Sequence, residues 1–317
     1  MKKVILITGV AGMIGSNLLK EYINKNFLII GIDNLTLGDK KFISQYLKKK
    51  NFFFFKYNLE NKINENKITN ILEKNYLQEA WLLAANSDIK NGTKNPNIDL
   101  NNTFLATFNT LNLIRKFLKN DTKILFSSSS AIYGDVKSKM IVENTINKPI
   151  SNYGAMKLAS EAYLSAYSKA NGSNVLIFRF PNVIGQNLTH GLLFDMKKKI
   201  LSSKKYIEVL GNGNQQKPYS HVSEIIRCMI YLKKKRYSDK INYFNIGTND
   251  KGIRVKEIVK LLKNKFKSKK KIIYQKNKIG WIGDIPRYQY STKKLKKTGF
   301  QFKLSSRDAI NKTVKNI

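Results

Sequence analysis

The stretch KVILITGVAGMIGSNLLK, from Lys3 to Lys20, decides the fold of this chain. An apolar run of strand length leads into three glycines and then into a segment whose apolar residues have helical spacing. Gly9, Gly12 and Gly15 would let the backbone turn tightly, approach a pyrophosphate and pack a helix against the strand. The N-terminus of that helix would offer free N–H groups and a positive dipole to an anion. Glycines also serve plain turns, and the G-x-x-G-x-x-G spacing differs from the G-x-G-x-x-G fingerprint, so the context has to decide.

The residues after this loop support a dinucleotide site. A second apolar run, FLIIGID at 27–33, ends on Asp33, about 20 residues beyond the glycines. An acid there can accept hydrogen bonds from the ribose hydroxyls of adenosine and would repel a 2′-phosphate, which favours NAD over NADP. We therefore expect NAD as the cofactor. The first part of its predicted site consists of Gly9, Gly12, Met13, Ile14, Gly15, Asp33 and Asn34.

The rest of the first half of the chain continues the same alternation. Four further apolar runs of strand length lie at 52–59, 79–85, 122–130 and 173–180. They are continuous rather than alternating, which is typical of parallel strands that are buried on both faces. Two long helical segments, roughly 97–118 and 151–171, lie between the later strands. The pattern predicts a doubly wound, Rossmann-type α/β fold.

After about residue 184 the spacing of strands and helices loosens. Turn-rich stretches such as GNGNQQKPYS, at 211–220, separate further helices. We expect a Rossmann domain that binds NAD at 1–183 and a smaller C-terminal lobe, mainly for the substrate, at 184–317. Part of that lobe, about 219–248, is expected to pack back on the first domain.

Composition narrows the class of protein. The 317 residues are 42% hydrophobic, which is enough for a large core, and no stretch approaches the roughly 20 apolar residues of a membrane span. The single cysteine, Cys228, excludes an internal disulfide, so we expect a cytoplasmic protein. The formal net charge of +37 would attract nucleic acid, but the lysines are scattered and the abundance of Lys, Asn and Ile is typical of AT-rich codon usage. An anionic substrate would also be favoured by this charge.

Tyr153 and Lys157 form the candidate catalytic pair. Their Y-x-x-x-K spacing alone means little, because five other tyrosines also have a lysine four residues later: Tyr46, Tyr133, Tyr231, Tyr274 and Tyr290. The position of Tyr153 is distinctive, since it opens a helix after a strand that ends in SSSSAIYG. Residues i and i+4 share one helix face, so an ammonium group at Lys157 beside an oxidised nicotinamide would lower the phenol pKa towards neutrality. The tyrosine could then act as a general base.

Six motifs in order resemble one family: TGVAGMIG, Asp33, LLAANSD, FSSSSAIYG, YGAMK and FRFPNVIG. The chain resembles the extended short-chain dehydrogenase/reductase family, and within it the NAD-dependent nucleotide-sugar epimerases and dehydratases, most of all UDP-glucose 4-epimerase. The segments EVLGNGNQQKPYSHVSEI and GWIGDIPRYQYSTKKLKKTGF also look like that family's C-terminal lobe, so the resemblance covers nearly the whole chain.

The resemblance implies a role for each matching residue. Tyr153 would be the catalytic base, Lys157 would lower its pKa and hold the nicotinamide ribose, and Ser129 would bind the reacting sugar hydroxyl. The implied cofactor contacts beyond the glycine loop are Asn58, Leu59, Ala84, Ala85, Tyr153 and Lys157. The implied substrate contacts are Ser129, Ser130, Tyr153, Asn182, Lys217 and Arg287. The sequence has only two histidines and one cysteine, and we expect no metal site.

The resemblance also implies a reaction: C4 epimerisation of a UDP-hexose through a transient 4-keto sugar, catalysed by a homodimer. A nucleotide-sugar reductase, decarboxylase or dehydratase is the alternative. A dehydratase is disfavoured because Ser130 and Ala131 stand where those enzymes have an Asp-Glu pair.

The chain also departs from the family at the expected phosphate contacts. Trp281 stands where a phosphate-binding arginine is common in the family, and Lys217 stands in place of another such arginine. A basic nucleic-acid-binding protein on a retained Rossmann fold is the alternative of another class.

Overall fold

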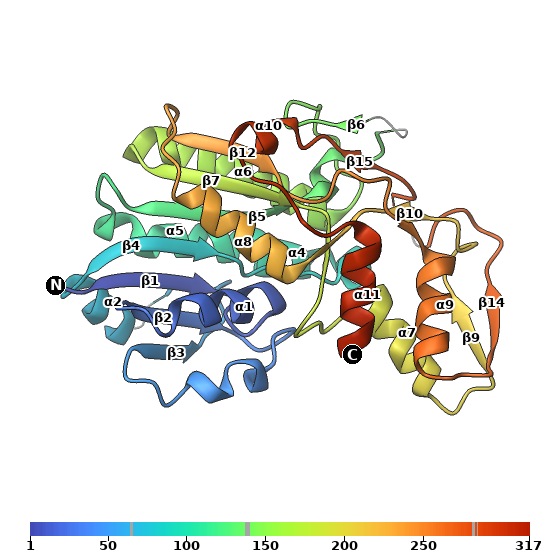
Figure 1. The fold of residues 1–317 in the computed structure, drawn as a ribbon. Helices are drawn as coiled ribbons and strands as arrows, with labels where there is room; N and C mark the ends of the chain where they lie inside the picture. The colour runs from blue at the N-terminus through green and yellow to red at the C-terminus, as the bar shows by residue number, and fades with distance from the viewer. Residues whose placement is uncertain (64–65, 137–139, 281–282, 284) are drawn as a thin grey trace.

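The computed structural model describes residues 1–63, 66–136, 140–280, 283 and 285–317. In this part of the chain a seven-stranded sheet forms the centre, with the order β12-β7-β5-β4-β1-β2-β3 and every neighbouring pair parallel (Figure 1). Its strands are β1 (Lys3–Thr8), β2 (Leu28–Asp33), β3 (Phe52–Lys56), β4 (Tyr76–Leu82), β5 (Lys123–Ser129), β7 (Asn174–Phe180) and β12 (Ile241–Asn245). The predicted doubly wound Rossmann-type fold is confirmed. Trp281 lies outside the described residues.

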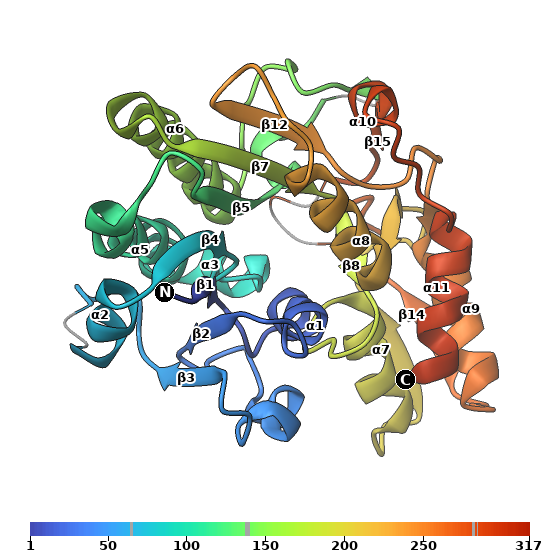
Figure 2. The ribbon, with the colours of Figure 1, turned by 60° about the vertical axis from the view of Figure 1, so that its left-hand side comes forward.

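Helices cover both faces of this sheet (Figure 2). One face carries α1 (Met13–Tyr22) and α8 (Val222–Lys233), and the other carries α2 (Asn66–Glu73), α5 (Ala106–Ile114) and α6 (Asn152–Asn171). Because successive side chains of a strand point to opposite faces, Ile5 and Ile7 pack under the first pair of helices, and Val4 and Leu6 pack under the second group. The strands therefore read as continuous apolar runs.

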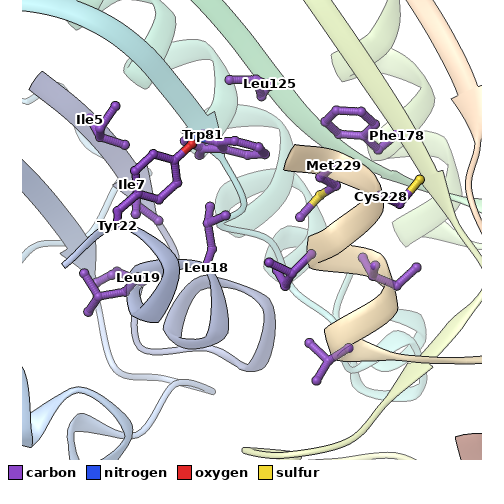
Figure 3. Packing of buried hydrophobic residues seen from close by; sticks show 14 of the residues in the cluster. Ile5, Ile7, Leu18, Leu19, Tyr22, Trp81, Leu125, Phe178, Cys228 and Met229 are labelled. Atoms are coloured by element: carbon purple, nitrogen blue, oxygen red, sulfur yellow. The ribbon is translucent and has the colours of Figure 1, made fainter. Parts of the chain in front are cut away.

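The core beneath α1 and α8 is centred on Trp81 (Figure 3). This side chain is fully buried, stacks on Phe178 with ring centroids 6.4 Å apart, and donates from Nε1 to Glu79 at 2.8 Å. Glu79 is also paired with Lys233 and hydrogen-bonded to Tyr22. β4 runs from Tyr76 to Leu82, so the range predicted from the apolar pattern, 79–85, is displaced by three residues at both ends.

The two long helical segments differ in regularity. The predicted helix at 151–171 is confirmed as α6, which begins after Ser151, whose hydroxyl accepts from the N–H of Gly154 at 3.1 Å, and ends at Gly172 with φ +63°. The segment predicted as a helix over roughly 97–118 is helical without a gap from residue 96 to residue 117, but its winding changes along four successive stretches. These are α4 (Pro96–Asp99), a π-helical stretch (Leu100–Leu105), α5 and a 3₁₀ turn (Arg115–Phe117).

The C-terminal part of the chain builds a second layer beside the sheet and also contributes α8 and β12 to it (Figure 1). Its own core joins α7, β9, α9 and α11. The remaining strands and α-helices of the described chain are α3 (Ile89–Lys94), β6 (Met140–Ile141), β8 (Asn182–Ile184), α7 (Leu192–Leu201), β9 (Tyr206–Val209), β10 (Gln216–Lys217), β11 (Tyr219–His221), β13 (Ile253–Arg254), α9 (Val255–Lys265), β14 (Lys271–Tyr274), β15 (Gln289–Tyr290), α10 (Lys293–Lys297) and α11 (Ser306–Asn316). Three short 3₁₀ turns lie at Lys40–Phe42, Ser44–Tyr46 and Ser130–Tyr133. Within the described ranges, no helix combines the length and the apolar composition needed to cross a membrane.

Candidate functional site

A cleft of about 960 Å³ runs along the carboxyl ends of the parallel strands, between the sheet and the C-terminal layer. This is the edge at which doubly wound sheets bind their ligands. The structure brings nearly all of the predicted site residues together there. The predicted residues that line the cleft are Gly9, Gly12, Met13, Ile14, Gly15, Asp33, Asn34, Asn58, Leu59, Ala84, Ala85, Ser129, Ser130, Tyr153, Lys157, Asn182 and Lys217.

The glycine loop between β1 and α1 has no room for a side chain at Gly9 or Gly15. Gly9 has φ +68°, and a Cβ there would lie 2.8 Å from the backbone nitrogen of Ala84. A Cβ on Gly15 would lie 2.1 Å from the carbonyl oxygen of Gly9. Thr8 fixes the loop against the end of β4, because its hydroxyl accepts from the N–H groups of Leu83 and Ala84 at 3.1 and 3.2 Å. The N-terminus of α1 therefore faces the cleft as a cradle that fits a pyrophosphate.

Asp33 lies at the end of β2 and is only 6% exposed. Its Oδ2 accepts from the N–H of Ala11 at 2.9 Å and its Oδ1 from the N–H of Leu35 at 2.8 Å. Burial raises the pKa of this carboxyl above its ordinary value, and the two backbone hydrogen bonds oppose that rise only in part. Each carboxylate oxygen keeps a further lone pair, so Asp33 can still accept from ribose hydroxyls. Asn34 beside it donates to Asn102 at 3.1 Å.

Ser129, Tyr153 and Lys157 converge on the cleft from two elements. Ser129 ends β5, Tyr153 lies in the first turn of α6, and their side chains are hydrogen-bonded. Lys157 is 1% exposed; its Nζ donates to the carbonyl of Ser127 at 2.5 Å and lies 5.9 Å from the centre of the Tyr153 ring. The spacing of i and i+4 therefore brings the pair to one helix face, as predicted.

The protein's own groups shift the pKa values of this pair in opposite directions. Burial raises the pKa of Tyr153 to about 12, the Asp99 carboxylate raises it further, and the hydrogen bond with Ser129 opposes both. Burial lowers the pKa of Lys157 to about 7, against the attraction of Glu161. The protein's own groups thus keep the phenol protonated at neutral pH. The predicted lowering of its pKa requires the positive nicotinamide ring together with a charged Lys157.

Tyr288 is a cleft residue that the sequence analysis missed. It is 7% exposed, and its hydroxyl accepts from Ser130 Oγ at 3.3 Å and from Asn182 Nδ2 at 3.2 Å. Arg287, which was the predicted substrate contact, is exposed and is not among the residues that line the cleft. Neighbours in extended backbone point in opposite directions, so Tyr288 faces inward where Arg287 faces outward. The signal in the sequence was only that Tyr288 adjoins Arg287.

Polar and cationic groups line the side of the cleft opposite the glycine loop. His190 faces it with Nδ1 3.0 Å from the hydroxyl of Thr189, and burial lowers the pKa of this imidazole. Lys198 and Lys217 also line the cleft, as does Leu192, with which α7 begins. The N-terminus of α7 therefore adds a positive dipole to these charges.

His221, by contrast, caps α8, with Nδ1 accepting from the N–H of Ser223 at 3.2 Å. Among the described residues, no group of three or more His, Cys, Asp or Glu side chains is placed to hold a metal ion.

The sheet, the glycine cradle and the serine–tyrosine–lysine set define a short-chain dehydrogenase/reductase of the extended type. Residues 5–247 match the sequence profile of the NAD dependent epimerase/dehydratase family. The chain belongs to this family, whose cofactor is NAD.

Relatives of similar length agree with this assignment. A protein of Methanocaldococcus jannaschii provisionally named UDP-glucose 4-epimerase is 28% identical over 98% of this chain and 97% of its own length. UDP-glucuronate 4-epimerase of Thermodesulfobacterium geofontis is 24% identical over 85% of this chain and 82% of its own. The crystal structure of Thermotoga maritima UDP-glucose 4-epimerase with UDP-glucose is 25% identical, with a TM-score of 0.84 over 98% of this chain and 97% of that one.

Proposed function

We propose that this protein is a UDP-hexose 4-epimerase that works through a transient 4-keto sugar. The observation that carries the proposal is the convergence of Ser129, Tyr153 and Lys157 at the edge of the cleft that also holds the glycine cradle. NAD held by the glycine cradle would supply the redox chemistry, as the acceptor and then the donor of the hydride at C4 of the sugar. The glycine positions fit this cofactor, because the tight turn that only glycine permits at Gly9 and Gly15 brings the N-terminus of α1 to the cleft.

The chain's own residues would handle the proton and the orientation of the sugar. Tyr153 would take the proton of the C4 hydroxyl, and Ser129, already hydrogen-bonded to the phenol, would hold that oxygen. Lys157, fixed by the carbonyl of Ser127, would supply a positive charge beside the phenolate. The ketone would be reduced after the sugar turns over, when Tyr153 gives the proton back.

The diphosphate of the substrate would lie against the C-terminal layer. Lys217, Lys198 and the N-terminus of α7 line this side of the cleft, and Asn182 and Tyr288 lie beside them. We propose that residues 184–317 form the substrate lobe that closes over the Rossmann domain at 1–183. The named UDP-sugar 4-epimerases among the relatives favour a UDP-sugar over other nucleotides.

A homodimer is part of the proposal. Phe104, Phe108 and Tyr163 form a half-buried aromatic cluster that joins the π-helical stretch, α5 and α6. A second copy could cover this cluster by pairing the same helices into a four-helix bundle. Measurement of the molar mass in solution tests this part independently of activity.

The decisive experiment supplies purified protein with UDP-glucose and follows the products by chromatography and NMR. We expect an equilibrium mixture with UDP-galactose and no net change in NADH. Tyr153→Phe should lower kcat by about a thousandfold and still bind NAD. No turnover across UDP-, GDP- and dTDP-sugars would refute the proposal, and net consumption of NADH or release of carbon dioxide would identify a reductase or a decarboxylase instead.

A further inference from the structure

One face of α6 carries a third buried residue beyond the catalytic pair. Glu161 lies one turn after Lys157 and two turns after Tyr153, and it is 3% exposed. Its Oε1 accepts from the hydroxyl of Ser128 at 2.5 Å. The consecutive serines Ser127–Ser129 at the end of β5 thus each bind one of these three helix residues. These contacts fix the position of α6 along β5 at three successive turns of the helix.

Arg179 on β7 holds the Glu161 carboxylate from the other side. Its Nε donates to Oε1 at 3.0 Å and its Nη2 to Oε2 at 2.7 Å, which is a two-pronged pair with both side chains 5% exposed or less. Nη1 of the same guanidinium donates to the Tyr133 hydroxyl and to the Glu143 carbonyl, both at 2.7 Å. A carboxylate held so completely cannot turn away from the helix face that it shares with Lys157.

Charged and titratable groups surround Lys157 from several elements. On α6 itself these are Tyr153 and Glu161, and behind Glu161 lie Arg179 on β7 and then Tyr133. Asp99, at the end of α4, adds negative charge near Tyr153. Glu161 is the group that acts on Lys157 by attraction, and it opposes the effect of burial on the pKa of the amine. Without the negative charge of Glu161, the buried amine would give up its proton at lower pH.

We propose that Glu161, held by Arg179 and Ser128, is a positioning residue for catalysis, which sets the register of α6 on β5 and maintains the positive charge of Lys157. The proposal rests on the epimerase function proposed above. The competing explanation is a buried ion pair that only stabilises the fold, and such pairs contribute little to stability beyond avoiding an unpaired charge. The two explanations differ in what they predict for the pH dependence of activity.

The test compares wild type with Glu161→Gln, which keeps the shape and hydrogen-bonding capacity of the side chain and removes its charge. The alkaline limb of kcat against pH should move to lower pH by about one unit, because the ammonium at residue 157 is lost earlier. If Glu161→Gln leaves Arg179 unpaired and does not fold, the double variant Glu161→Gln/Arg179→Gln replaces both charges. A shift in the same direction but smaller is expected there, because the positive charge of Arg179, which opposes the effect of Glu161 on Lys157, is removed as well.

A matched control is available on β4, towards the amino ends of the strands and away from the cleft at their carboxyl ends. Glu79 is also buried and paired, with Lys233, and it does not touch the catalytic helix. Glu79→Gln should lower the melting temperature without moving the pH limb. A stability loss without a shift in the Glu161 variant, or equal shifts in both variants, would overturn the proposal.

A second measurement needs no sugar. Ultraviolet difference titration of each protein with NAD, against its Tyr153→Phe counterpart, follows ionisation of this phenol alone. The pKa of Tyr153 should be higher in the Glu161→Gln protein, because Lys157 is less often charged. If wild type turns over no nucleotide sugar, the proposed function fails while this titration still decides the role of Glu161. An unchanged titration would contradict that role.

Discussion

At the scale of single residues, Lys157 combines a charge with almost complete burial. The amine has one protein hydrogen-bond acceptor that the structure gives, the carbonyl of Ser127, and lies 4.7 Å from the centre of the Phe126 ring. Burial lowers its pKa to about 7. Burial of such an amine has a cost in stability.

This cost predicts how stability depends on pH. Because the folded-state pKa of Lys157 lies below its ordinary value of 10.5, the unfolded chain binds more protons between about pH 7 and 10.5, and wild-type stability should rise with pH across that window. Lys157→Met should therefore raise the free energy of unfolding by about 2 kcal/mol at pH 6, with a gain that shrinks towards pH 10.5. Denaturant unfolding across this pH range measures it.

The exposed Lys49 offers the matched control. Lys49→Met should change the free energy of unfolding little at any pH. A Lys157→Met protein that is less stable than wild type at pH 6 would show that the hydrogen bond to Ser127 outweighs the burial of charge.

The grouping of residues in the cleft could be predicted where order along the chain identified them. Ser129, Tyr153 and Lys157 were found because a strand, a run of serines and a helix start follow one another. Tyr288 could not be found in this way, since it is one of 16 tyrosines and it reaches Ser130 only across 158 positions of sequence. The pairing of Glu161 with Arg179 is likewise a product of strand and helix packing, which one sequence does not display.

At the scale of elements, the turn from β1 into α1 is the most constrained part of the site. The Cα of Gly15 faces the carbonyl of Gly9 so closely that the helix could not approach the strand with any side chain there. The shape of the cradle and the packing of α1 therefore both depend on the absence of a side chain at Gly15.

Gly15→Ala tests this dependence. We expect affinity for NAD to fall about tenfold or more and the free energy of unfolding to fall by about 1–3 kcal/mol, because the helix must move off the loop. Calorimetric titration with NAD and thermal unfolding measure the two effects. Gly172→Asn is the control, because a Cβ there meets no atom within 4 Å and asparagine tolerates the φ of +63° at this helix end. Unchanged NAD affinity in the Gly15 variant would contradict the proposed cradle.

Elements could be predicted well where apolar patterns were uninterrupted. β1, β2, β5 and β7 agree with their predicted ranges to within a residue. The start of β4 was missed because the strand begins with the letters YLQ, which are not a continuous apolar run. The π-helical winding of Leu100–Leu105, inside the segment predicted as a helix, was missed. Apolar spacing does not distinguish a turn that contains about one extra residue.

At the scale of the whole molecule, charge is the distinctive property. The formal net charge is +37, and both NAD and the proposed substrate are anions. Charges more than about 10 Å from a diffusing ligand act on it only when the salt concentration is low. At low salt, the excess of lysine should therefore speed the capture of the proposed UDP-sugar substrate.

We expect kcat/KM for the nucleotide sugar to fall several-fold as ionic strength is raised from low to physiological values, mainly through KM. Steady-state kinetics in sodium chloride and in matched sucrose, which leaves charge unscreened, measure the effect. A flat salt profile would show that the charge has no part in substrate capture. Tight, salt-sensitive binding of nucleic acid by a Tyr153→Phe protein would favour the alternative class of function.

The position of β12 has a consequence for how the chain is made. Residues 241–245 form the outermost strand of the sheet and pair with β7 at 174–180. During synthesis, the edge of β7 therefore stays unpaired while about 60 further residues leave the ribosome. An open strand edge is a template for association with other chains. Premature termination before residue 241 would thus yield fragments that aggregate, and completion of the catalytic half must wait for the part of the gene that encodes its partner layer.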